Sequence, residues 1–174
     1  MAVKTRNNVQ RSTDRSAALP TGLTLSLCYG ARVRREELPD GYRLHERLGH
    51  ASFHRHNGDV ALVVYDGGLT NQVLPSQFES FAEIVAEMGG VAVFIDAEAL
   101  TSYTTDFRKD WTSWFRANRS ELRECHVLIR SALVRMGVNL VNPLIGNLMR
   151  PHSDRASFTQ ALSLATAEPP SRAS

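Results

Sequence analysis

The sequence predicts an α/β fold in which helices pack against a mixed β-sheet of four to five strands. Two observations lead to this prediction. The Asn57-Gly58 step separates two strand-like segments, and Asn-Gly favours the tight turn of an antiparallel hairpin. From Asp59 to Ala165, short apolar segments then alternate with amphipathic ones. Strands separated by helices must cross over, so most of the sheet should be parallel.

The predicted elements run in the order hairpin, helix, strand, helix, strand, helix, edge strand, helix. The first helix should begin at the capping box Ser76-x-x-Glu79, and Pro143 should shorten the third helix. Pro151 restricts the last strand to the edge of the sheet. The predicted ranges are 51–56 and 59–65 for the hairpin, 76–88, 106–122, 132–145 and 153–166 for the helices, and 91–95, 126–129 and 147–152 for the later strands.

The chain divides into four predicted regions. Residues 1–22 should be a disordered basic N-terminus, and residues 23–50 an N-terminal extension with one candidate extra strand at 23–29. Residues 51–166 should form the α/β domain, and residues 167–174 a disordered tail. The net charge of +2 is too small to indicate sequence-specific binding of nucleic acid.

Composition excludes several classes of protein. The 174 residues include only two cysteines, Cys28 and Cys125, which are too few and too far apart for a disulfide framework or a zinc ribbon. No apolar run approaches the roughly 20 residues of a membrane span, and the first residues lack the apolar core of a secretory signal. We therefore expect a cytoplasmic protein with reduced thiols.

Three local segments, together with the order of elements, resemble a known family. These are VVYDGG at 63–68, the Trp-rich DFRKDWTSWF at 106–115 with the strand HVLI at 126–129 after it, and the Asp-capped SDRASFTQAL at 153–162. With the order of elements over residues 51–166, they resemble the STAS domain, and in particular its SpoIIAA-like group. The resemblance implies a STAS-like sheet and a non-catalytic regulatory or scaffold module that binds a protein partner in signalling.

The same resemblance directs attention to the start of the second helix. STAS proteins of the anti-anti-sigma type carry a phosphorylatable serine there, and the matching turn of this chain offers Ser102, Thr104 and Thr105 as candidate phospho-switch residues. The Ser-Ser-Gly signature of those proteins is absent. A phosphate would lie favourably at the helix N-terminus, whereas the alternative is a plain helix cap.

A candidate interaction surface combines the second helix with the unusually apolar third helix. Its residues are Asp106, Trp111, Met136, Leu140 and Leu144. A small sheet covers one face of a helix, so the surplus apolar surface should bind a protein partner, a second copy of the chain, or a lipid. The alternative is a fully buried core helix. The function predicted first is therefore binding of a protein partner or a homodimer, and the alternative is a carrier or sensor of an apolar small molecule or membrane surface.

Catalytic chemistry is the third hypothesis. No nucleophile elbow, phosphate-binding loop or metalloprotease motif occurs. Asp66 and Asp96 end apolar strands and, with Ser131, resemble part of a phospho-receiver pocket, although the acidic pair and the lysine of that family are missing. His54 and His56 would share one face of a strand without a third ligand at metal-binding spacing. We expect no metal, no cofactor and no enzymatic activity.

Overall fold

The computed structural model describes residues 33–167, apart from the side chain of Leu133. The predicted disordered N-terminus, the candidate strand at 23–29 and most of the predicted tail lie outside these residues.

The described chain is a mixed α/β structure, as predicted. Its strands are β1 Arg34–Leu38, β2 Gly41–His45, β3 Gly49–Arg55, β4 Val60–Leu69, β5 Val91–Tyr103, β6 Leu122–Leu128 and β7 Met149–His152. Its α-helices are α1 Leu74–Met88, α2 Thr105–Ala117, α3 Ala132–Val141 and α4 Arg155–Ala167, and the short 3-10 helices are η1 Asn71–Val73, η2 Arg119–Glu121 and η3 Asn142–Ile145.

The strands form one sheet in the order β1-β2-β3-β4-β5-β6-β7. Neighbours from β1 to β4 pair antiparallel, and neighbours from β4 to β7 pair parallel. The prediction of four to five strands is therefore wrong, because the described residues form seven. The additional hairpin β1–β2 turns at Pro39-Asp40, and its strands are hard to recognise because only Tyr42 and Leu44 are buried among charged residues.

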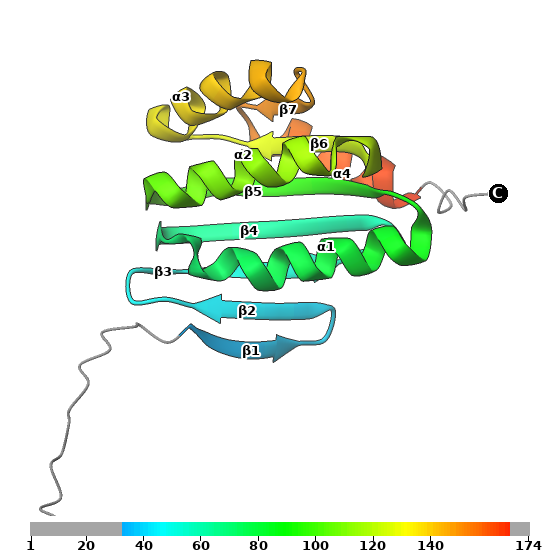
Figure 1. Ribbon diagram of the computed structural model, residues 1–174, viewed down its shortest axis with the longest axis horizontal. Helices are drawn as coiled ribbons and strands as arrows, with labels where there is room; N and C mark the ends of the chain where they lie inside the picture. The colour runs from blue at the N-terminus through cyan, green and yellow to red at the C-terminus, as the bar shows by residue number, and fades with distance from the viewer. Residues whose placement is uncertain (1–32, 168–174) are drawn as a thin grey trace, which may run out of the picture. The chain divides into compact units, whose positions relative to one another are not determined.

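Helices cover the two faces of the sheet unequally. The crossover helices α1, α2 and α3 all lie on one face, here called the front face, as right-handed connections between successive parallel strands require. Helix α4 follows β7 and lies behind the sheet in Figure 1, on what we call the back face. The large apolar core lies between the sheet and the three front helices, and includes Phe81, Ile84, Trp111 and Phe115. A smaller cluster around Phe94 and Phe158 lies under α4.

Several element ends differ from the predicted ones. Helix α1 begins at Leu74, directly after η1, so Ser76 lies inside the helix and does not cap it; Thr70 instead accepts a hydrogen bond from the backbone of Gln72 and starts η1. Strand β5 continues to Tyr103, eight residues beyond the predicted end. Pro143 ends α3 early, as predicted, and the chain continues as η3. No helix within residues 33–167 is long and apolar enough to cross a membrane.

Candidate functional site

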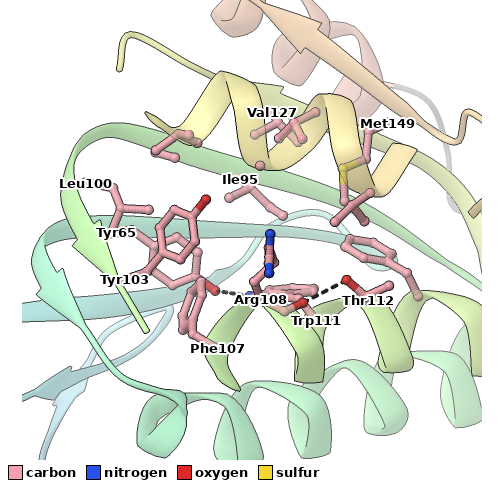
Figure 2. Close-up of a pocket in the computed structure, with 16 residues that line it drawn as sticks. Tyr65, Ile95, Leu100, Tyr103, Phe107, Arg108, Trp111, Thr112, Val127 and Met149 are labelled. Carbon is pink, nitrogen blue, oxygen red and sulfur yellow. Dashed lines mark hydrogen bonds between the residues drawn. The ribbon is translucent and has the colours of Figure 1, made fainter. Parts of the chain in front are cut away.

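An apolar pocket lies on the front face between α2 and α3. Strands β4, β5, β6 and β7 form its floor, α2 forms one wall and α3 the other, and its cavity measures about 80 Å³ (Figure 2). Native interiors are close-packed, and voids larger than a water molecule are few. An apolar pocket between two helices, over the floor of the sheet, is therefore the strongest candidate site in the described chain.

Aromatic rings build the α2 wall. Phe107, Trp111 and Phe115 recur every four residues, so the helix places all three against the sheet. The Trp111 and Phe115 rings stack with centroids 4.9 Å apart, and Tyr65 meets Phe107 edge to face at 5.4 Å. These contacts fix the rings, so the wall is preformed.

The α3 wall depends on a glycine. A Cβ atom on Gly137 would lie 2.3 Å from the hydroxyl oxygen of Tyr103, so only glycine lets this ring approach the helix so closely. Val134, Val138 and Val141 line the rest of α3. Because valine side chains are short and stiff, the wall leaves space that larger residues would fill.

The polar atoms at the base of the pocket are largely satisfied within the protein. The indole nitrogen of Trp111 donates to the Tyr65 hydroxyl at 3.1 Å, and that hydroxyl donates to Oε1 of Gln77 at 2.7 Å. Full burial raises the pKa of Tyr65 well above its usual range. Nε2 of the fully buried Gln77 has no hydrogen-bond partner within the described residues. The floor therefore presents a hydrophobic surface and no titratable group near neutral pH.

One charged residue, Arg108, lines this pocket. It lies on α2 one turn before Thr112, whose hydroxyl donates to the Arg108 carbonyl at 2.8 Å. Figure 2 shows the Arg108 nitrogens on the side of α2 that faces the pocket. The site thus combines an apolar body with one cation.

The predicted phospho-switch residues lie near a second pocket, of about 280 Å³, at the carboxyl ends of β4 and β5. Ser102 and Thr104 line it, whereas Thr105 is the first residue of α2 and does not. Thr104 caps α2 by accepting a hydrogen bond from the backbone of Phe107 at 3.2 Å. Tyr103 lines both pockets, so it forms part of the wall between them.

The predicted interaction surface is brought together only in part. Met136, Leu140 and Leu144 are 57%, 54% and 56% exposed, and their four-residue spacing along α3 and η3 forms what we call the apolar stripe. Asp106 is also exposed, in the first turn of α2. Trp111 does not belong to this surface, because it is 6% exposed and packs against the sheet.

The histidines of the N-terminal half bind different carboxylates, although His45 and His50 lie opposite each other on β2 and β3 with ring centroids 5.9 Å apart. His45 pairs with Glu36 at 2.8 Å, and His54 pairs with Asp40 at 3.0 Å, a hydrogen bond that lowers the pKa of Asp40. His56 lies after the end of β3, so it does not share a strand face with His54 as expected. Within residues 33–167, no group of three or more His, Cys, Asp or Glu side chains is arranged to hold a metal ion.

Asp66 and Asp96 lie inside β4 and β5 and do not end their strands as expected, because both strands continue beyond the apolar run. Asp96 is 7% exposed and accepts a hydrogen bond from Arg155 at 2.7 Å, which ties β5 to α4. Asp66 is exposed on β4. The environment of Asp96 is therefore that of a structural ion pair.

A chain of hydrogen bonds on the back face was not predicted. Nε2 of His126 donates to Glu124 at 3.0 Å, Nδ1 of His126 lies 2.8 Å from Nε2 of His152, and Nδ1 of His152 lies 3.0 Å from the Ser157 hydroxyl. We call these four residues the histidine chain. It joins β6, β7 and α4, and burial lowers the pKa of His152. The spacing of His126 and His152 in the sequence gives no signal of it.

Comparisons with known proteins add one finding. No family model matches the sequence, and no curated protein matches it. Among solved structures, the chain is similar to an uncharacterized protein of the DUF3478 family from Shewanella loihica PV-4, described as having a SpoIIAA-like fold. The two are 11% identical, the match covers 75% of this chain and 92% of the other, and the TM-score is 0.49. The structural similarity is thus to a protein of the SpoIIAA-like fold, the fold that the sequence resemblance implies.

Proposed function

We propose that the protein is a non-catalytic binding module that holds an apolar small molecule in the pocket between α2 and α3. The observation that supports this proposal is the cavity of about 80 Å³ beside preformed aromatic rings. An unfilled apolar cavity costs stability, because its lining loses contacts that a well-packed core would make. A ligand that fills the cavity would restore those contacts. We therefore favour the carrier of an apolar small molecule, the alternative in the sequence analysis, over the binding of a protein partner.

The test is a titration with hexanol, a neutral apolar probe, followed by NMR of the backbone amides. We expect shift changes at residues that line the pocket, such as Gly137 and Thr112, and none around α4. Val138→Phe places a larger side chain at the pocket wall and should abolish these changes. The matched control Leu164→Phe, at a residue 64% exposed on α4, should leave them intact. Hexanol binding that survives Val138→Phe, or no binding to the wild type, would contradict the proposal.

A second candidate function is binding of a protein partner or a second copy through the apolar stripe. The observation that favours it is that three large apolar side chains on one side of α3 and η3 are each more than half exposed. Such patches are typical of interaction sites. Light scattering of the wild type and of Leu140→Lys tests the homodimer: a dimer that the substitution dissociates supports it. A monomeric wild type that also recovers no partner from a cell extract counts against this candidate.

A further inference from the structure

The guanidinium of Arg108 is the charged group of the pocket that the proposed function leaves unexplained. Among the residues that line the pocket, Arg108 alone has a charged side chain, and the residue as a whole is half-buried. Burying a cation in apolar surroundings is costly unless an anion or hydrogen bonds compensate it. Because Arg108 is half-buried, either water or a bound anion can supply the compensation for its charge.

The carboxylates next to Arg108 on α2 do not supply it. Asp106 lies 3.6 Å from Lys109, and Asp110 accepts a hydrogen bond from Asn71 at 2.8 Å. No ion pair or side-chain hydrogen bond of the Arg108 guanidinium is present within residues 33–167. Elsewhere, a partly buried arginine such as Arg55 is paired, with Glu87. Arg108 thus keeps its donors for a group that is not part of the described chain.

We propose that the ligand of this pocket is a short aliphatic carboxylate, whose carboxylate binds Arg108 and whose alkyl chain fills the cavity. The inference rests on the proposed function. A guanidinium offers parallel N–H donors that match a carboxylate, and a single cation balances its single charge. A phosphate monoester would bring up to two charges and three acceptor oxygens, for which the lining offers no second cation.

The size of the cavity sets the length of the alkyl chain. A cavity of about 150 Å³ holds the six carbons of benzene, so the cavity of about 80 Å³ encloses roughly three carbons of an alkyl chain. Within that length, each further methylene that is buried should raise affinity roughly fourfold. Beyond it, the additional carbons would lie in solvent, and affinity should stop rising.

The test compares hexanoate with hexanol, which has the same alkyl chain and no charge, by isothermal titration calorimetry and amide NMR. We expect hexanoate to bind the wild type at least about tenfold more tightly than hexanol, as a charge-assisted pair with a partly buried arginine should allow. Affinity should rise from acetate to butanoate and level off at hexanoate. Hexyl phosphate should bind no more tightly than hexanoate.

Two variants separate the head group from the pocket. Arg108→Gln should reduce hexanoate binding to the level of hexanol while hexanol binding is unchanged, which also shows that the variant folds. The control Arg116→Gln removes an exposed arginine in the last turn of α2 that does not line the pocket, and it should keep the preference for hexanoate. If hexanol and hexanoate bind the wild type equally, or Arg108→Gln keeps the preference, the carboxylate inference is wrong while the proposed function stands. If neither probe binds, both are wrong.

Discussion

The two faces of the sheet are stabilised in different ways. On the front face, three helices bury a continuous apolar core, and the polar side chains in it, such as Gln77, are few. On the back face, α4 covers a smaller apolar cluster and is fixed to the sheet by ion pairs and by the histidine chain. The stability that the front face provides should therefore depend on side-chain volume, and the stability that the back face provides should depend on protonation. The apolar pocket between α2 and α3 lies on the front face, where packing sets its shape.

The largest expected effect is on the front face. Trp111→Ala removes a ring that stacks on Phe115 and donates to Tyr65. Replacement of a large buried aromatic residue by alanine costs about 3–5 kcal/mol. We therefore expect the free energy of unfolding in urea to fall by that amount. Leu164→Ala, at an exposed residue of α4, should change it by less than about 0.5 kcal/mol. A loss below about 1 kcal/mol for Trp111→Ala would show that the front core is not closely packed.

An intermediate effect is expected on the back face, where hydrogen bonds replace packing. His126→Phe keeps a ring stacked on Phe94 but removes both nitrogen atoms, so His152 and Glu124 each lose a partner. A buried polar group left without its partner costs about 1–3 kcal/mol. The loss should appear in urea unfolding at neutral pH. His50→Phe changes a histidine outside the chain and should cost less; equal losses would argue that the histidine chain contributes nothing.

A smaller expected effect is a dependence of stability on pH, which arises from the back face. Burial, together with the charge of His126, lowers the pKa of His152 below its ordinary value of 6.5. The folded protein then binds fewer protons than the unfolded one, so stability is complete above pH 6.5 and falls as the pH drops from there to the folded pKa. His56, whose pKa burial also lowers, acts in the same direction. The lowered pKa values of Asp40 and Asp154 act at lower pH, below their ordinary value of 3.8.

Unfolding measured from pH 7.5 to 5 checks this linkage. His152→Gln keeps a polar side chain and removes the titrating ring, so its stability should fall less steeply with decreasing pH than that of the wild type. Some of the slope should remain because of His56. If the stability of His152→Gln depends on pH as steeply as that of the wild type, another group causes the pH dependence. Trp111→Phe, a change on the front face, should lower the whole profile without altering its slope.

The same contrast explains what the sequence could predict. The parallel half of the sheet was predictable, because its strands are apolar runs and its helices have apolar stripes such as Phe107, Trp111 and Phe115. Strands β1 and β2 were missed, because a two-stranded edge with one exposed face shows few apolar residues. The extension of β5 to Tyr103 was missed because Thr101 and Ser102 are typical of a turn as much as of a strand end.

The candidate site was predictable only as a region. The apolar character of α3 indicated surplus surface, and Met136, Leu140 and Leu144 are exposed in the structure. The pocket depends instead on the opposite side of α3, where Gly137 admits Tyr103, and on Arg108 of the facing helix α2. Both are properties of contacts between elements that are distant in sequence. A periodic pattern identifies which side of a helix is apolar, but not whether the facing surfaces fill the space between them.

The smallest effect on stability is expected at the apolar stripe, which is the outer surface of the front layer. Leu140→Lys places a charge where the side chain is 54% exposed, so the free energy of unfolding should change by less than about 0.5 kcal/mol. Val141→Lys, one residue further along α3 and 8% exposed, should destabilise the protein strongly, because it buries an unpaired ammonium group. Urea unfolding of the two variants measures the contrast. If Leu140→Lys costs as much as Val141→Lys, the stripe is covered in solution by another part of the chain or by a second copy, and the front face has an additional layer that residues 33–167 do not include.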